Sequence, residues 1–244
     1  RQSVILTPTQ QIAAAGYARL ARGELEAAVH ASLAPLELLH PSWGRLPRDR
    51  YLRDGGRYRS RRHSCFELET ATGDIVQTPQ RPHWQSTDYN ALHGGMLRWF
   101  EPIEPRLTSA GVWLELLGGL GRVFEAVMPV PRWFIEAHQF RIDTLGGVGR
   151  PTPEGAHRDG VDFVAVIIVA RHGVSGGETR VFDNAGPEGV RFTMTEPWSA
   201  LLLDDARVKH ETTPLQPLEP PALGYRDTLV LTFRQHGFQE PAAG

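Results

Sequence analysis

The sequence predicts an α+β fold in which helices brace one face of an antiparallel barrel or sandwich. Apolar residues recur at helical spacing in the first half of the chain, whereas short β-rich runs separated by Gly, Pro, Asp and Asn fill the second half. At 244 residues the chain is long enough to bury one substantial core. We therefore expect a single domain over residues 1–244.

Helices are expected in two regions. In the first third of the chain, Thr7-Pro8 offers a helix start, and Gly23 is expected to divide the helical region into two pieces. A second helix is expected over residues 108–128, where apolar residues recur at spacings of three and four. Pro129 should end it, because proline cannot continue a helix.

Short strands are expected beyond the second helix. The run Ala165–Ala170 is apolar at successive positions, so this strand should be buried on both faces. Earlier in the chain, the alternating arginines of Arg57–Arg62 suit an extended segment, either a solvated strand edge or a lid over a site. The strands after the helix are expected at residues 133–142, 161–170, 178–182, 190–195, 199–203, 208–213 and 228–233.

Composition limits the classes of partner. A formal net charge of -2 gives no large basic field, so we expect a small-molecule partner and no nucleic acid. No stretch approaches the roughly 20 apolar residues of a membrane span, so no membrane partner is expected. The single cysteine, Cys65, excludes an intrachain disulfide and favours a reducing compartment, the cytoplasm. Oligomeric state is left open, with a homodimer as one option.

A candidate metal site begins at His157-Arg158-Asp159. In an extended segment, residues i and i+2 point to the same side, so His157 and Asp159 can share one ion. The triplet follows a Gly/Pro-rich loop and precedes the most apolar strand, and His210 lies farther along the chain. Two histidines and one carboxylate form the facial triad that leaves coordination positions open on iron(II), whereas a structural zinc site would have four ligands.

An arginine that follows the second histidine would complete this site. A dicarboxylate cosubstrate that chelates the metal needs a cation for its far carboxylate, and a guanidinium can bind it through two hydrogen bonds. Arg226, at the start of the last expected strand, is the candidate. Arg234, at the other end of that strand, is its rival.

Several segments, in order along the chain, match one group of enzymes: Gln85–Asn90, Gly94-Gly95, Arg98–Pro102, His138–Arg141, His157–Gly160, Val174–Arg180 and Tyr225–Asp227. Through them the sequence resembles the bacterial iron(II)/2-oxoglutarate dioxygenases that hydroxylate free or N-modified amino acids, the L-isoleucine dioxygenase-like family.

This resemblance implies a double-stranded β-helix, the jelly-roll or cupin-like core, braced by the N-terminal and central helices. It implies iron(II) as the metal, held by His157, Asp159 and His210, with Arg226 on 2-oxoglutarate. It further implies that O2 and 2-oxoglutarate are consumed, that succinate and CO2 are released, and that an unactivated C–H bond of an amino acid is hydroxylated.

Candidate substrate-binding residues follow from the need to hold a carboxylate and an amine. Arg141, Gln139 and Arg98 are the first candidates, because Arg141 and Gln139 lie on a strand expected to line the barrel. The competing candidates are Arg59 and Arg62 for the carboxylate, Glu178 or Asp183 for the amine, and Trp84, Trp99 and Phe140 for an apolar wall.

Three alternatives stay open at this point. The same cofactor chemistry can desaturate or cyclise an amino-acid-derived substrate. A zinc-binding or noncatalytic cupin-like protein could use the same three side chains. A scaffold protein would need none of them.

Outside the triad, isolated histidines are more often structural; these are His63, His83, His93, His172 and His236, whereas His138 is undecided.

Overall fold

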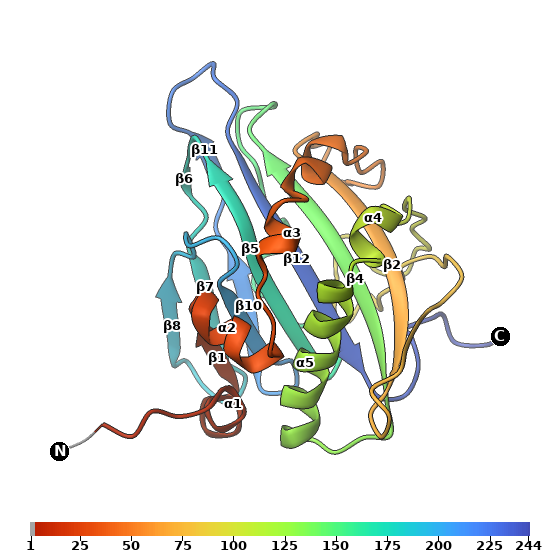
Figure 1. The fold of residues 1–244 in the computed structure, drawn as a ribbon. Coiled ribbons are helices and arrows are strands. Elements are labelled where there is room, and N and C mark those ends of the chain that lie inside the picture. The colour runs from red at the N-terminus through yellow and green to blue at the C-terminus, as the bar shows by residue number, and fades with distance from the viewer. Residues whose placement is uncertain (1–2) are drawn as a thin grey trace.

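A seven-stranded antiparallel sheet forms the centre of the computed structural model, which describes residues 3–244 (Figure 1). Its strand order is β1-β9-β5-β12-β4-β2-β3. The strands are β1 (Tyr17–Leu20), β9 (Ala200–Asp204), β5 (Phe163–His172), β12 (Tyr225–Arg234), β4 (Arg132–Asp143), β2 (Arg59–Glu69) and β3 (Ile75–Gln77).

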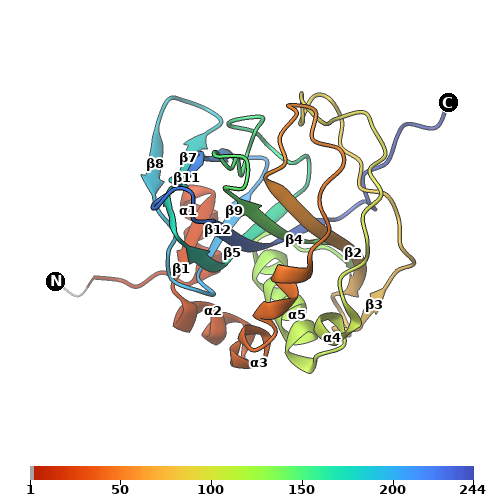
Figure 2. The same ribbon diagram turned by 90° about the horizontal axis from the view of Figure 1, so that it is seen from above.

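Two small antiparallel sheets lie on the face of the large sheet that is opposite the helices (Figure 2). One has the order β10-β7-β8, and the other pairs β11 with β6. This sandwich confirms the predicted α+β fold with a jelly-roll core. The strands are β10 (Val208–Thr212), β7 (Thr179–Asp183), β8 (Gly189–Phe192), β11 (Leu215–Pro217) and β6 (Val174–Gly176).

The helices cover the other face of the large sheet, with α5 (Gly111–Val127) as the longest (Figure 1). Gly119 of α5 allows close packing, because a Cβ there would lie 2.5 Å from the Cα of Val29 in α2. No helix within residues 3–244 is long and apolar enough to cross a membrane. The shorter helices are α1 (Pro8–Ala15), α2 (Arg22–Val29), α3 (Ala34–Glu37), the 3-10 helix η1 (His40–Arg45) and α4 (Pro105–Thr108).

The first third of the chain differs from its prediction. The break falls at Gly16, which adopts a φ of 82° and donates its N–H to the carbonyl of Ile12, whereas Gly23 lies inside α2. The left-handed conformation suits glycine and ends α1. Residues 17–20 then form β1, because Ala18 and Leu20 are buried and the strand pairs with β9.

The prediction for Arg57–Arg62 was also wrong. This segment is neither a solvated edge nor a lid, because residues from Arg59 onward belong to β2 and pair in register with β4. Arg59 and Arg61 are buried, and the carboxylate of Asp49 lies 2.8 Å from the first guanidinium and 3.8 Å from the second. This buried counter-ion offsets the free-energy cost of burying the two guanidinium groups.

Strand β5 separates two apolar cores. Phe163, Ala165 and Ile167 pack in the core beneath the helices, whereas Val164 and Ile168 pack in the core shared with the small sheets. The expected strand with two buried faces is thus confirmed. The expected helix at 108–128 is observed as α5, and each strand expected after it is present with ends shifted by no more than three residues.

Candidate metal and cosubstrate site

A cavity of about 920 Å³, including its open mouth, lies on the face of the large sheet away from the helices. Its floor is formed by alternate residues of β4 and β12, and its rim by the loop before β5 and by β10. This size is typical of small-molecule sites. The predicted residues His157, Asp159, His210 and Arg226 all line it.

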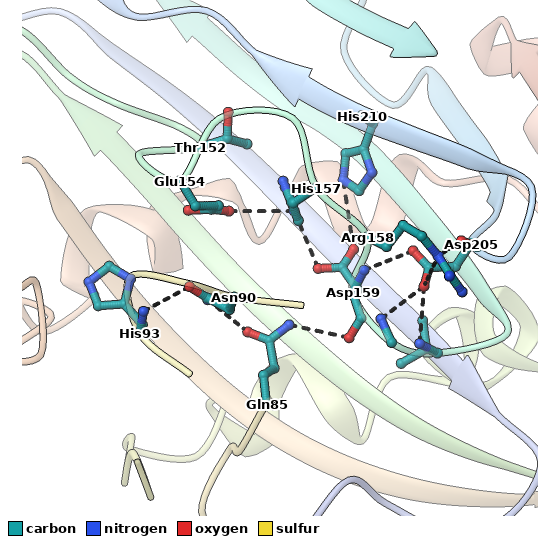
Figure 3. A network of polar contacts seen from close by, with 12 residues as sticks. Gln85, Asn90, His93, Thr152, Glu154, His157, Arg158, Asp159, Asp205 and His210 are labelled. Carbon is teal, nitrogen blue, oxygen red and sulfur yellow. Dashed lines mark hydrogen bonds and ion pairs between the residues drawn. The ribbon is translucent and has the colours of Figure 1, made fainter. Parts of the chain in front are cut away.

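The three predicted metal ligands converge in this cavity (Figure 3). His157 and Asp159 lie in the loop before β5, and His210 lies in β10; one ligand atom from each falls within 4.8 Å of the others. The Nε2 atoms of His157 and His210 lie 3.4 and 3.7 Å from the Asp159 carboxylate. Two backbone hydrogen bonds of 3.0 Å between the histidines fix their spacing.

Neighbouring groups orient these side chains. His157 donates Nδ1–H to the carbonyl of Gly155 at 2.9 Å, which leaves Nε2 facing Asp159. The carboxylate of Asp205, which is only 1% exposed, accepts the backbone N–H groups of Asp159, Gly160 and Val161 at 2.9, 2.8 and 3.2 Å. Asp205 therefore fixes the turn that carries Asp159.

The turn after Asp159 also depends on a glycine. Gly160 adopts a φ of 78°, and a Cβ there would lie 2.4 Å from Nε2 of Gln239 and 2.5 Å from the ring of Tyr89. A larger residue would therefore displace the loop that carries the triad.

The pKa values of the triad reflect one strongly interacting group. Burial lowers the pKa of His157, but the carboxylates of Asp159 and Glu154 outweigh burial and raise it to about 10. Burial together with His157 lowers the pKa of His210 to about 4. Burial raises the pKa of Asp159, but His157 outweighs it and the pKa is lower than usual. Two imidazoles and an ionised carboxylate form a donor set suited to a divalent cation with open coordination positions.

Arg226 presents an unpaired guanidinium to the same cavity. It is 4% exposed, and among residues 3–244 its Nε and one terminal nitrogen have no hydrogen-bond partner. Burial, with a contribution from Arg171, lowers its pKa to about 10, so it stays charged at neutral pH. A buried cation without a partner is unfavourable, and an anionic ligand would relieve this. Thr228, two residues along β12, lines the same wall.

The rival arginine lies elsewhere. Arg234 is at the opposite end of β12, is not among the residues that line the cavity, and donates to the carbonyl of Gly237 at 2.9 Å. Its position offers no contact with a ligand near the triad.

The predicted substrate-binding residues separate into two groups. Arg98 lines the cavity and donates to Oε1 of Gln85 at 3.3 Å. Gln85 in turn donates to the carbonyl of Asp159 at 3.4 Å (Figure 3). Arg141 and Gln139 point to the opposite face of β4, where they bond Asp227 and Ser42, respectively. Side chains alternate across a strand, so neither can reach the cavity that His138 and Phe140 line.

The remaining candidates fall on both sides of this division. Arg59 and Phe140 line the cavity, whereas Glu178 pairs with Arg180 at the surface, and Trp99 is 56% exposed. The other competitors, Arg62, Asp183 and Trp84, are not among the lining residues.

Sequence reasoning missed several residues of the cavity. Glu154 lies 3.4 Å from Nε2 of His157, and Glu136, His83 and Arg61 also line the walls. The period-two alternation of strand residues was a usable signal, because a strand that turns His138 inward must also turn Glu136 inward. Nothing in the sequence pointed to Asp205, whose role depends on the folded turn.

Comparisons with known proteins agree with this geometry. The model of the 2OG-Fe dioxygenase family matches residues 40–232. The structure of a bsmA homolog from Methylobium petroleophilum PM1 is 53% identical, with a TM-score of 0.93 and 98% of each chain covered. A search of curated protein sequences finds no match to this chain.

Two more distant structures share the fold. IDO from Bacillus thuringiensis has a TM-score of 0.76 at 18% identity, with 96% of this chain and 98% of that chain covered. The Fe(II)/(alpha)ketoglutarate-dependent dioxygenase TqaL has a TM-score of 0.72 at 17% identity, with 93% and 85% covered. Since the family model spans most of its length, the chain belongs to the 2OG-Fe dioxygenase family, which uses iron(II), 2-oxoglutarate and O2.

Proposed function

We propose that this protein hydroxylates an unactivated C–H bond of a free or N-modified L-amino acid, with 2-oxoglutarate converted to succinate and CO2. The observation that carries the proposal is the joint presence, in one cavity, of a His-Asp-His donor set and an unpaired buried guanidinium. Family membership supports the cofactor chemistry. The specificity for an amino acid rests on the sequence resemblance and on the cavity.

The assigned roles follow from the donor atoms. His157, Asp159 and His210 would hold iron(II), and Arg226, with Thr228 beside it, would hold the far carboxylate of 2-oxoglutarate. When bound, iron with 2-oxoglutarate and O2 supplies the oxidising power for C–H hydroxylation. The protein's own part is to hold both substrates in register and to keep bulk water away from the reacting carbon.

The cavity walls favour a small substrate with an apolar portion. Phe140, Val166 and Val230 line the face formed by the large sheet, and Val161 lines the loop side. Arg98 is connected to Asp159 by hydrogen bonds through Gln85. It provides the cation that the carboxylate of an amino acid requires. These features support an aliphatic amino acid.

The test is an anaerobic titration of the protein with iron(II) and 2-oxoglutarate. Bidentate chelation of the keto acid should produce a weak visible charge-transfer band. Admission of air with a panel of L-amino acids should then release succinate and give a product heavier than the substrate by one oxygen atom. A product that has instead lost two hydrogens would indicate desaturation or cyclisation, and iron binding without the band would contradict the cosubstrate assignment.

Asp205 offers a test of how the metal loop is held. Burial, together with the nearby Asp159 charge, raises the pKa of the Asp205 carboxyl to about 7. In Asp205→Asn, one oxygen can still accept a backbone N–H, but the amide nitrogen cannot, so the turn should loosen. We expect iron(II) affinity to fall by about 10- to 100-fold, the usual effect of altering a group that orients a ligand.

Iron affinity in Asp205→Asn is measured by competition with a chelator of known affinity. The matched control is Asp204→Asn, one residue earlier, whose side chain accepts a hydrogen bond from the N–H of Ala206 and from no other described residue. Equal affinities in both variants would show that the turn holds Asp159 without Asp205.

A further inference from the structure

A second cluster of ionisable side chains lies in the cavity beside the triad. It consists of His63, His83, Glu136 and His138, all at least nine-tenths buried, with one nitrogen or oxygen from each within 4.8 Å of the others. Glu136 and His138 come from β4 and His63 from β2, where it pairs in register with His138. Three members, all except His63, line the cavity.

Glu136 is the only carboxylate of this cluster, and it is held from one side. Nε2 of His63 lies 2.8 Å from its Oε1, and Nδ1 of His83 lies 3.1 Å from the same oxygen. Its other oxygen, Oε2, receives no hydrogen bond from residues 3–244. The carboxylate is therefore oriented by two donors and retains one oxygen for a ligand.

Two imidazoles beside Glu136, those of His83 and His138, carry no charge at neutral pH. Arg61 donates to Nδ1 of His138 at 2.9 Å, which makes that ring nitrogen an acceptor and the ring a neutral tautomer. Burial lowers the pKa of His83 to about 4 and also lowers that of His138. A buried carboxylate bonded only to imidazoles gains most from a cationic ligand.

Cations face the same part of the cavity. Arg98 is 2% exposed, and its Nε has no partner among the described residues. Arg61 is held between the rings of Phe100 and Phe140, with its guanidinium carbon 3.9 and 4.4 Å from the ring centroids. Arg59 and Arg61 share the carboxylate of Asp49, whereas Arg98 hydrogen-bonds only to the amide oxygen of Gln85 among the described side chains. Arg98 is therefore the guanidinium available to an anionic group.

Glu136 lies far from the proposed 2-oxoglutarate anchor. In the pairing of β12 with β4, Arg226 is opposite Ile142 and Thr232 is opposite Glu136. Six residues of strand separate the two rows, a distance of about 20 Å. The unpaired cation Arg226 and the carboxylate of Glu136 thus lie at different ends of the cavity. Arg98 is joined to His83 of the cluster by two backbone hydrogen bonds of 2.8 and 3.0 Å.

We infer that Glu136 and Arg98 form a subsite for the zwitterionic head group of a free α-amino acid, with Glu136 binding the ammonium and Arg98 the carboxylate. This assignment rests on the proposed function and narrows it, because an N-acylated substrate has no ammonium to offer. The apolar walls then direct an aliphatic side chain toward the triad.

A second metal ion is the competing occupant of the cluster, and the surroundings disfavour it. The Nδ1 lone pair of His138 already accepts from Arg61. Arg59, Arg61 and Arg98 lie close by, with Asp49 as the paired counter-ion of the first two. A divalent cation would add to this positive charge, whereas a zwitterion adds none.

Binding is measured by anaerobic calorimetry on protein loaded with iron(II) and 2-oxoglutarate, after the charge-transfer band has been recorded. The probes are L-leucine, L-isoleucine and L-methionine, and for the tightest of these the α-hydroxy acid, the α-carboxamide and the N-acetyl derivative. Each replacement of a charged group should weaken binding to the wild type by about 10- to 100-fold, because a charge-assisted hydrogen bond is lost.

Two variants separate the roles. Glu136→Gln keeps an oxygen for His63 and His83 but cannot bind an ammonium as an anion, so its preference for the amino acid over the hydroxy acid should shrink to about threefold or less. Its preference over the carboxamide should persist. Arg98→Met should show the reverse pattern. Glu178→Gln and Arg62→Met, whose parent residues lie outside the cavity, are the matched controls and should keep both preferences.

Each outcome is decisive. If the band forms but none of the amino acids binds, or the derivatives bind as well as the parent does to the wild type, the subsite is wrong and the dioxygenase proposal stands. Absence of the band would overturn the proposed function and this assignment with it. A second equivalent of bound metal that disappears in Glu136→Gln would assign the cluster to an ion and overturn the subsite.

Discussion

The Asp159→Ala variant is expected to bind iron(II) more than about 100-fold less tightly and to lose the charge-transfer band and all succinate release. Asp159 is the only carboxylate of the triad, and removing it leaves two imidazoles as ligands. Changes in residues that only orient ligands already lower affinity by about 10- to 100-fold, so loss of a ligand should exceed this.

The measurement is metal content after dialysis, together with anaerobic spectroscopy. Asp74→Ala, an exposed carboxylate in the turn between β2 and β3, is the control and should behave as the wild type does. Retention of stoichiometric iron and of the band in Asp159→Ala would mean that the metal is held elsewhere, with the His63 cluster as the next candidate.

The Arg226→Met variant is expected to raise the Kd for 2-oxoglutarate by about 100-fold or more, or ~3 kcal/mol, with little change in iron affinity. A carboxylate that enters this buried wall would lose the guanidinium that faces it and still be desolvated. Methionine has similar length and fills the space that the arginine stem occupies, so the effect should come from charge rather than from a cavity.

Titration of the band with 2-oxoglutarate at fixed iron(II) gives this Kd. Arg234→Met removes the rival arginine at the other end of β12 and should leave the Kd unchanged. A large effect in Arg234→Met together with none in Arg226→Met would exchange the two assignments.

Much of the fold, and the closeness of His157 to Asp159, could be predicted from sequence because they depend on local periodicity. Helix α5 and the strands after it follow from spacings of three or four and of two. His157 and Asp159 share a side of one extended segment, and the order of segments supplied His210. The strand β1 was missed because its four residues are too short a run to show a period, and because pairing with β9 stabilises it.

The substrate end of the cavity was not accessible in this way. Arg141 was chosen for its charge and its strand, but the strand's phase turns it toward Asp227 and away from the cavity. That phase is fixed by which residues of β4 pack against the helices, among them Trp133, Ile135 and Ala137. Glu136 and His138 point into the cavity because of the same alternation. Knowledge of one residue of β4 that packs against the helices would therefore have given the directions of Glu136, His138 and Arg141.

Neighbouring residues of β5 and of β12 face two different environments. On β5, Val166 faces the cavity and Ile167 the helical core; on β12, Val230 and Leu231 divide in the same way. Under the proposed function, substitutions at Val166 and Val230 would reshape the cavity wall and would also change the packing of the second apolar core. Substitutions at Ile167 and Leu231 would disturb only the core beneath the helices.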